Sequence, residues 1–325
     1  METVQMSVDD KMIGQNEIAE AAIRISSHVR HTPILRVDMA EFGGNASGLN
    51  FPLCLKLELL QHAGSFKPRG AFNRLLCAAN PPSAVIAASG GNHGAAVAYA
   101  ARALGIRAEI FVPGSTPAAK VARIASYGAQ VVQGGDVYSD ALEASRIRQA
   151  ETGALEVHAY DDPDVMAGQG TVGREFEAEA PDLTHILVAT GGGGLIGGIA
   201  AWYASRAAVI SVEPEGCPTL HSALAAGAPV AAAVGGVAAD SLGARQVGAL
   251  MFPIAVAHVA LAVLVSDAAI LKAQRLLWDR LRLIAEPGGA TALAALLSGA
   301  FVPPAGARVG VIICGANTDP AKVAA

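Results

Sequence analysis

The segment His185-Ile186-Leu187-Val188-Ala189-Thr190-Gly191-Gly192-Gly193-Gly194-Leu195-Ile196-Gly197-Gly198 indicates the fold class of this chain. It reads as a buried strand, a glycine turn and an apolar helix. Consecutive glycines at such a junction cost conformational entropy unless the backbone must wrap a ligand. Exposed N–H groups at a helix start, together with the helix dipole, favour a bound anion. The segment therefore predicts a phosphate site at the carboxyl end of a strand.

The same alternation of short β-rich runs and helical runs extends from residue 53 onward. The expected strands are Leu53–Glu58, Ala84–Ala88, Arg107–Val112, Gln130–Gln133, Leu155–Ala159, His185–Ala189, Val209–Glu213, Val259–Val265 and Arg308–Cys314. The expected helices include Ala95–Leu104, Pro117–Tyr127, Ser139–Thr152, Asp164–Ala180 and Asp267–Leu281. Strands joined by helical crossovers form parallel sheets, with ligands at the carboxyl ends of the strands. We therefore expect an α/β fold.

Composition narrows the class of protein. The chain has 325 residues, of which 52% are apolar and 16% charged, and this balance is typical of a well-buried enzyme. The net charge of −5 and the absence of basic blocks argue against nucleic acid and membrane partners. Met1–Gln15 has no signal-peptide core. The cysteines lack metal-ligand spacing: Cys54, Cys77, Cys217 and Cys314. We expect a soluble, cytoplasmic protein.

A lysine in an unusual context marks the segment Gly64-Ser65-Phe66-Lys67-Pro68-Arg69-Gly70-Ala71. Pro68 disfavours helical dihedrals at Lys67 and suits a first helical position. Lys67 is thus expected just before a helix, where the dipole disfavours an ammonium ion. A partly neutral lysine is a nucleophile suited to carbonyl cofactors. An ordinary solvated lysine after a strand is the alternative.

A second glycine-rich turn, Ala88-Ser89-Gly90-Gly91-Asn92-His93-Gly94, precedes a helix expected near Ala95. Its N–H groups suit a carboxylate, and the Asn92 amide can donate to a phenolate or accept from a hydroxyl. The same residues are also ordinary turn chemistry with an Asx or Ser cap, and His93 fits a plain helix start. Both interpretations stay open from this turn alone.

Two further patterns are ambiguous when taken singly. The last strand ends in Val311-Ile312-Ile313-Cys314-Gly315-Ala316-Asn317, where the cysteine can be a small apolar core residue. Gly192, Gly194 and Gly197 also satisfy the dinucleotide fingerprint, and Glu213 follows where a ribose-binding acid would lie. A dinucleotide site therefore competes with a simple phosphate site, but it leaves Lys67 and the Ser89–Gly94 turn without a role.

Taken together, Ser65–Ala71, Ser89–Gly94, Gly191–Gly194 and Cys314–Asn317 resemble the serine/threonine dehydratase family of pyridoxal-phosphate enzymes, fold type II (tryptophan synthase β-like). The resemblance runs from about Thr32 to the C-terminus. It implies two α/β lobes, each a mostly parallel twisted sheet flanked by helices, with the cofactor between them. By resemblance, residues 84–159 form a small substrate-binding lobe, and residues 1–83 and 160–325 form a large cofactor-binding lobe. Most members of the family are homodimers.

The resemblance also implies a role for each matched residue. Lys67 would form a Schiff base with pyridoxal 5′-phosphate and then remove the substrate α-proton, so one lysine serves twice. The ring would contact Phe66, Asn92 at its 3′-oxygen, Cys314 at its nitrogen, and Glu286 nearby. The phosphate would be held by Gly191, Gly192, Gly193, Gly194 and the Leu195 amide. The substrate carboxylate would be received by Ser89, Gly91, Asn92 and His93.

Two positions depart from related racemases. Serine racemases place a serine opposite the lysine, where this chain has Gly90, and glycine has no side chain to return a proton. Tyr160 matches the aromatic residue of the dehydratases better than the animal racemases. Direct two-base racemisation is therefore not expected.

A third departure concerns metal. Some relatives bind a divalent cation through an acid, a backbone carbonyl and an aspartate, but here Thr219 replaces the aspartate and leaves Glu213 with the Cys217 carbonyl. One carboxylate supplies too few oxygen ligands for a hard cation, so no metal site is expected. The chain ends soon after Cys314, and feedback inhibition by isoleucine is not expected.

These patterns predict an amino-acid ammonia-lyase (threonine/serine dehydratase) that eliminates water from a 3-hydroxy amino acid to give a 2-oxo acid and ammonia. L-Threonine and L-serine are the expected substrates. A bulkier substrate such as hydroxyaspartate or phenylserine, and serine racemase-type activity, are the alternatives within the family. An NAD(P)-dependent oxidoreductase and a non-catalytic ligand-binding protein are the alternatives from other classes.

Overall fold

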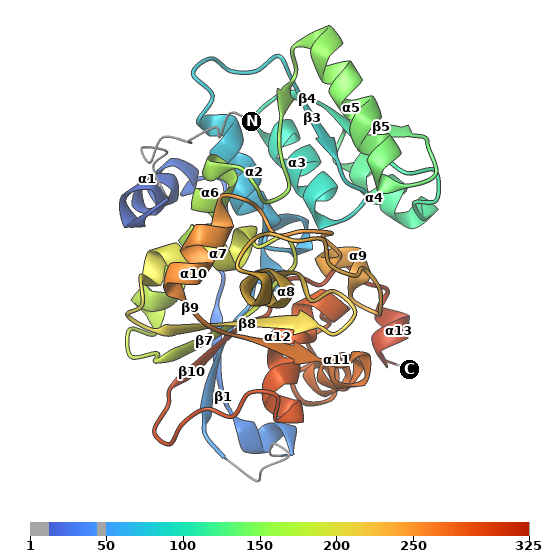
Figure 1. The fold of residues 1–325 in the computed structure, drawn as a ribbon. Helices are drawn as coiled ribbons and strands as arrows, with labels where there is room; N and C mark the ends of the chain where they lie inside the picture. Colours follow the sequence, from blue (N-terminus) through green and yellow to red (C-terminus); the bar gives the residue numbers. More distant parts are fainter. Residues whose placement is uncertain (1–12, 44–49, 325) are drawn as a thin grey trace.

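The computed structural model describes residues 13–43 and 50–324. The expectation that Met1–Gln15 is no signal peptide concerns a segment of which residues 1–12 lie outside the described part. The expected α/β fold is confirmed by two sheets (Figure 1). The larger has the order β1-β2-β10-β7-β8-β9 and the smaller β5-β4-β3-β6. β1 and β2 pair antiparallel, and the other described strand pairs are parallel.

The strands agree closely with the sequence pattern. They are β1 (Ile34–Asp38), β2 (Pro52–Lys56), β3 (Ala84–Ala88), β4 (Arg107–Val112), β5 (Gln130–Gln133), β6 (Leu155–Glu156), β7 (His185–Ala189), β8 (Ala208–Pro214), β9 (Val259–Val265) and β10 (Val309–Ile312). β1 was missing from the expected strands because it is an edge strand of mixed burial in which Arg36 and Asp38 interrupt the apolar run. The expectation that Leu155–Ala159 is all strand was wrong after Glu156.

The helices cover both sheets. They are α1 (Gln15–Ile25), α2 (Lys67–Leu76), α3 (Asn92–Ala103), α4 (Ala118–Ser126), α5 (Tyr138–Thr152), α6 (Pro163–Glu179), α7 (Gly194–Tyr203), α8 (Thr219–Ala226), α9 (Ala239–Leu242), α10 (Met251–His258), α11 (Asp267–Leu281), α12 (Pro287–Ser298) and α13 (Pro320–Ala324). Of the helices found in the described ranges, none is long and apolar enough to cross a membrane.

Two helix starts differ from expectation, and both matter for the site. α2 begins at Lys67 itself, not after it, because Phe66 already has helical dihedrals (φ −58°, ψ −19°) and Pro68 follows within the first turn. α3 begins at Asn92 and not near Ala95, since the extended Gly91 ends the turn that follows β3. Lys67 and Asn92 therefore both lie at helix N-termini.

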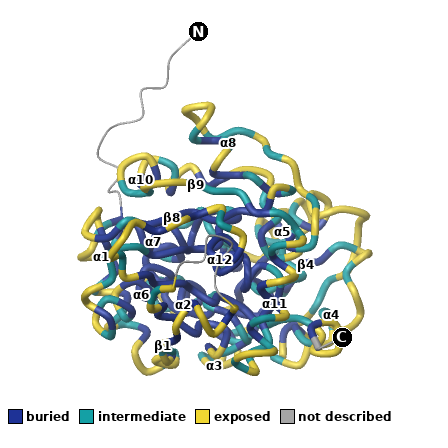
Figure 2. Tube along the Cα trace, turned by 90° about the horizontal axis from the view of Figure 1, so that it is seen from below, coloured by how far each residue is buried: buried dark blue, intermediate teal, exposed yellow. Residues whose placement is uncertain are grey.

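The core divides between the two sheets. Figure 2 shows α7 and α12 in the buried interior, and every residue of α12 from Gly288 to Leu297 is buried. The apolar cluster around the smaller sheet also takes in Ile25, Phe72 and Val165 from outside the 84–159 range. An ion pair between Lys120 of α4 and Asp240 of α9 connects the helices of the two sheets. The lobe boundary at 84–159 stays a prediction.

Candidate active site

One cavity gathers the residues expected to bind the cofactor. Its lining includes Phe66, Lys67, Asn92, Gly191, Gly192, Gly193, Gly194, Leu195, Glu286 and Cys314. It also includes residues that the sequence did not single out for this purpose: Tyr160, Ala189, Ile196, Ser241, Leu242 and Gly288. Ser241 and Leu242 belong to the short helix α9, which carries no motif, so no sequence signal pointed to them. The cavity lies where the carboxyl ends of β7 and β10 meet the starts of α2 and α3.

Lys67 is positioned by a direct pairing between its own segment and the end of β10. Ser65 and Gly315 form an antiparallel bridge, and the Phe66 N–H donates to the Cys314 carbonyl at 3.2 Å. The Lys67 Nζ donates to the Ala159 carbonyl at 2.7 Å. These contacts bring Lys67 and Cys314, which are distant in sequence, to one end of the cavity.

The environment of Lys67 favours its neutral form. Burial lowers the pKa of the Lys67 ammonium to about 8, because removing the charge from water is unfavourable. The Phe66 ring lies with its centroid 5.2 Å from the Lys67 Nζ. An amine with this pKa is available as a nucleophile and as a base near neutral pH.

The glycine loop between β7 and α7 offers a row of free donors. Among the described residues, the backbone N–H groups of 191–196 donate to no protein acceptor. Those in the first turn of α7 are free because the hydrogen bonds within a helix leave the first N–H groups without a partner. Gly193 has φ +96°, and a Cβ at Gly192 would overlap the Tyr160 ring. Glycine is therefore required both by the backbone conformation and by close approach. The loop fits a phosphate group held by N–H donors at a helix start.

Asn92 and Glu286, of which Glu286 is buried and Asn92 half-buried, form a hydrogen-bonded pair in the cavity wall. The Asn92 Nδ2 donates to Glu286 Oε1 at 2.5 Å, and Asn317 Nδ2 donates to Asn92 Oδ1 at 2.6 Å. Burial raises the pKa of the Glu286 carboxyl to about 7, although the Asn92 hydrogen bond opposes this. The Cys314–Asn317 motif by itself predicts no role for Asn317, because its partner Asn92 is far away in sequence.

Cys314 is a buried, neutral thiol at the cavity wall. Its Sγ donates to the Gly288 carbonyl at 3.5 Å. Burial raises the pKa of the Cys314 thiol, and the nearby Glu286 carboxylate raises it further. A neutral thiol cannot stabilise a protonated ring nitrogen as a carboxylate would.

The turn expected to bind the substrate carboxylate lies beside this cavity rather than in its wall, apart from Asn92. The Ser89 Oγ accepts the Gly91 N–H at 3.3 Å. The His93 side chain is buried with Nε2 2.7 Å from the Val157 carbonyl, and burial lowers the pKa of its imidazole to about 3. His93 is thus neutral and already paired, so only its backbone N–H, in the first turn of α3, is suited to an anion.

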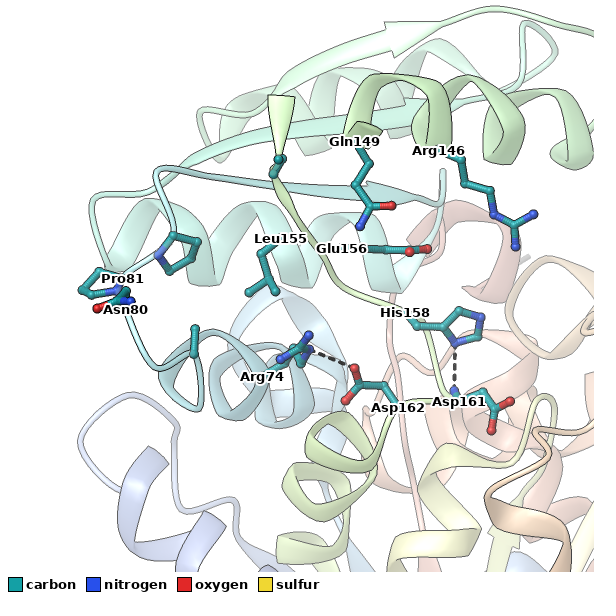
Figure 3. A pocket seen from close by; sticks show the side chains of 14 residues that line it. Arg74, Asn80, Pro81, Arg146, Gln149, Leu155, Glu156, His158, Asp161 and Asp162 are labelled. Carbon is teal, nitrogen blue, oxygen red and sulfur yellow. Dashed lines mark hydrogen bonds and ion pairs between the residues drawn. The ribbon is translucent and has the colours of Figure 1, made fainter. Parts of the chain in front are cut away.

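The segment between β6 and α6 connects the smaller sheet to the cavity. His158 Nδ1 accepts the Asp161 N–H at 2.8 Å, and Arg74 pairs with Asp162 at 2.9 Å, beside an open polar pocket (Figure 3). Between these residues, the Ala159 carbonyl holds Lys67 and the Tyr160 ring covers Gly192. This short connection therefore reaches both the lysine and the glycine loop.

Two departures from the family pattern can be placed in the structure. A Cβ at Gly90 would lie 2.9 Å from the Thr116 methyl group, so Thr116 occupies the space that a larger residue would need. Glu213 is fully buried, and its carboxylate oxygens accept the Leu220 and His221 N–H groups at 2.6 and 2.8 Å. Burial raises the pKa of Glu213 to about 7. Glu213 therefore serves the start of α8, which also leaves the dinucleotide interpretation without its acid.

Potential metal ligands gather elsewhere. Among residues the structure describes, a group of three is formed by His31, Glu175 and Glu179. The Lys56 Nζ already contacts both carboxylates, at 2.7 and 2.6 Å. These residues form an ion-pair cluster.

A lysine whose pKa is lowered to about 8, a glycine loop with free N–H groups and a partly buried amide–carboxyl pair together fit an enzyme that holds a phosphorylated carbonyl cofactor. The described residues fit pyridoxal phosphate, since the loop accommodates the phosphate and Lys67 faces the same cavity. When bound, that cofactor supplies an electron sink for charge on the substrate α-carbon.

Comparison with known proteins agrees. The family model of pyridoxal-phosphate dependent enzymes matches residues 25–315. The chain is 38% identical over 313 residues to an L-threonine ammonia-lyase of Geobacter sulfurreducens, covering 95% of this chain and 76% of that protein. It is 39% identical over 315 residues to a phenylserine dehydratase of Ralstonia pickettii, covering 94% of each. Maize serine racemase superimposes with a TM-score of 0.88 at 31% identity, covering 96% of each chain.

The chain belongs to the pyridoxal-phosphate dependent enzyme family, and pyridoxal 5′-phosphate is its cofactor. Its fold is that of the type II enzymes. Within the family it is an ammonia-lyase that acts on hydroxy amino acids by an elimination reaction.

Proposed function

We propose that the substrates are L-threonine and L-serine, which lose water by elimination to give an enamine. The imine tautomer of this product then takes up water and releases ammonia to leave a 2-oxo acid. The arrangement of bases around the cavity supports the elimination, and similarity to an L-threonine ammonia-lyase supports the choice of substrate. Lys67 is the amine that faces the cavity, and Gly90 provides no side chain to act from the opposite side. A single base at the α-carbon supports proton removal followed by loss of a β-hydroxyl, because Gly90 has no side chain to return the proton to the other face.

Each step assigns a task to a residue of the chain. The free N–H groups at the start of α3 bind the substrate carboxylate, and those of 191–195 bind the cofactor phosphate. Lys67 would hold the cofactor until the substrate binds, and its free amine would then take the proton from the substrate α-carbon. Asn92 would donate toward the cofactor 3′-oxygen, and Cys314 would lie at the ring nitrogen, where a neutral thiol cannot stabilise the protonated form as a carboxylate would. Tyr160 limits the access of water to the glycine loop.

The substrate is tested by measuring 2-oxo acid release from a panel of L-threonine, L-serine, threo-3-hydroxyaspartate and phenylserine. Threonine and serine are expected to give the highest kcat/KM, and Lys67→Ala is expected to lower kcat by at least about 10³-fold. Preference for phenylserine, which the Ralstonia relative's name makes the second candidate, would replace the proposed substrate and leave the reaction unchanged.

Racemisation is tested in the same mixtures. Chiral analysis of L-serine after partial turnover is expected to show no appreciable D-serine, because Gly90 has no proton to give. Accumulation of D-serine comparable to pyruvate would contradict the single-base mechanism.

We further propose that residues 84–159 form a lobe able to move against the rest of the chain, and that the protein is a cytoplasmic homodimer. The four free cysteines support a reducing compartment. The exposed ion pair between Lys120 and Asp240 stabilises the contact between the helices of the two sheets by about 0–1 kcal/mol. We propose that this weak contact breaks when the sheets separate during substrate entry. Sedimentation of the holoenzyme tests the dimer.

A further inference from the structure

A strained turn next to the cavity offers a backbone carbonyl in a fixed direction. Ala63 has φ +55° and Gly64 φ +72°, so two successive residues are in the left-handed region. A side chain at Gly64 would overlap the Asn317 Oδ1. The absence of a side chain at Gly64 thus lets Asn317 pack against the turn. The Asn317 Nδ2 donates a hydrogen bond to the Ala63 carbonyl at 2.8 Å.

This contact decides how the Asn317 amide is oriented. A backbone carbonyl only accepts hydrogen bonds, so the end of Asn317 that faces Ala63 must be its NH₂ group. The same Nδ2 lies 2.6 Å from one amide atom of Asn92. Because Asn317 presents a donor there, the facing atom of Asn92 must be its carbonyl oxygen.

The orientation of Asn92 follows in turn. With Oδ1 engaged by Asn317, its Nδ2 faces Glu286 Oε1 at 2.5 Å. The reverse orientation would place Asn92 Oδ1 against the Glu286 carboxyl and set two NH₂ groups against each other. One N–H of Asn92 is used by Glu286, and the second remains for a group in the cavity, which Asn92 lines.

We propose that Asn317 is a positioning residue that fixes the Asn92 amide with its N–H toward the cofactor 3′-oxygen. The inference rests on the role proposed above for Asn92. The chain of constraints starts at the Ala63 carbonyl and passes through Asn317 to Asn92. It makes the donor preorganised, which matters because an oxygen bearing negative charge is stabilised by a donor already in place.

The test is Asn317→Asp, which keeps the shape of the side chain and replaces its donor by acceptors. In this variant Asn92 turns its NH₂ toward the introduced carboxylate and its carbonyl oxygen toward the cofactor. We expect the midpoint of the pH titration of the bound cofactor's visible absorbance to move upward by about one unit, and kcat to fall about tenfold or more. Asn80→Asp, the same change at an exposed residue, is expected to change neither.

A double-variant cycle separates positioning from general damage. Asn92→Ala removes the donor, and adding Asn317→Asp to it is expected to shift the absorbance midpoint and kcat no further, because Asn317 acts through Asn92. Asn317→Ala, which adds no charge, is expected to give an intermediate shift and serves if Asn317→Asp does not fold. Additive effects of the two changes, or a wild-type midpoint in both Asn317 variants, would overturn the proposal.

Failure of the underlying role is recognised separately. If Asn92→Ala retains the wild-type absorbance midpoint, Asn92 does not contact the 3′-oxygen, and the proposed role of Asn92 is wrong. If Asn92→Ala shifts the midpoint and Asn317→Asp does not, only the positioning role of Asn317 is wrong.

Discussion

Lys67 shows how burial at one residue sets the chemistry of the site. Its amine is half-buried at the first residue of α2, and its pKa of about 8 follows mainly from desolvation. The sequence placed this lysine near a helix N-terminus but could not give its depth. Depth depends on Phe66, Ala159 and the end of β10, which reach it only after folding.

The Lys67 pKa predicts how the apoprotein captures its cofactor. Only the neutral amine attacks an aldehyde, and the neutral fraction increases as the pH rises through about 8. Between pH 7 and 9 the rate of chromophore formation with pyridoxal phosphate is expected to rise roughly tenfold. Stopped-flow absorbance measures it, with Lys67→Ala as the blank. A rise of about a hundredfold, which the ordinary lysine pKa of 10.5 gives over this range, would show that the lysine is not desolvated in solution.

At the level of elements, the β7–α7 loop is specified almost entirely by local sequence. Gly193 is demanded by backbone geometry, as its φ of +96° shows, and a run of four glycines is a signal that can be read from the residues alone. What covers the loop is not local. Tyr160 and Met251 lie against Gly192 and Gly193, and they come from other parts of the chain.

This packing predicts the effect of a single methyl group. In Gly192→Ala the new Cβ overlaps the Tyr160 ring, which has to move, and the phosphate-binding N–H groups shift with it. We expect the dissociation constant for pyridoxal phosphate to rise about tenfold or more, measured by absorbance titration of the apoprotein. The matched control is Gly134→Ala, where a Cβ meets open space. Equal affinities in the two variants would contradict the proposed phosphate site.

Across the whole molecule, a buried ion network joins α2, β2 and α6 behind the site. Arg69 donates to Glu58 at 2.8 and 2.7 Å and to Glu175 at 3.0 and 3.1 Å, and Lys56 donates to Glu175 at 2.7 Å. Arg69 lies two residues after Lys67, so the network fixes the helix that begins with the proposed nucleophile. Burial alone would raise the pKa of Glu175, but Arg69 and Lys56 outweigh it and lower it to about 2.

The sign of this shift predicts acid sensitivity. A carboxyl whose pKa is lower in the folded state stabilises the fold above its ordinary pKa, and that contribution is lost as the pH falls from about 5 toward 2. Glu175→Gln is expected to cost about 3 kcal/mol at pH 7 and to flatten the dependence of unfolding free energy on pH below 5. Urea denaturation between pH 7 and 3 measures both effects.

The control for this network is Glu151→Gln, which removes a surface carboxylate paired with Arg148 at 3.4 Å. Its expected cost is below about 1 kcal/mol, because both partners are exposed to water. If the Glu175 and Glu151 variants lost the same stability, the buried network would not hold α2 in place as we describe.

Local sequence was enough to predict most of the strands, the glycine turns and the place of Lys67 near a helix start, because periodicity and left-handed backbone requirements are local properties. Which side chains meet depended on the tertiary fold. Asn92 and Asn317 are 225 positions apart, and Asn92 and Glu286 are 194 apart, so no spacing predicts their contact. Burial set the pKa values of Lys67 and Glu286, since desolvation depends on everything packed around a group rather than on its neighbours in the chain.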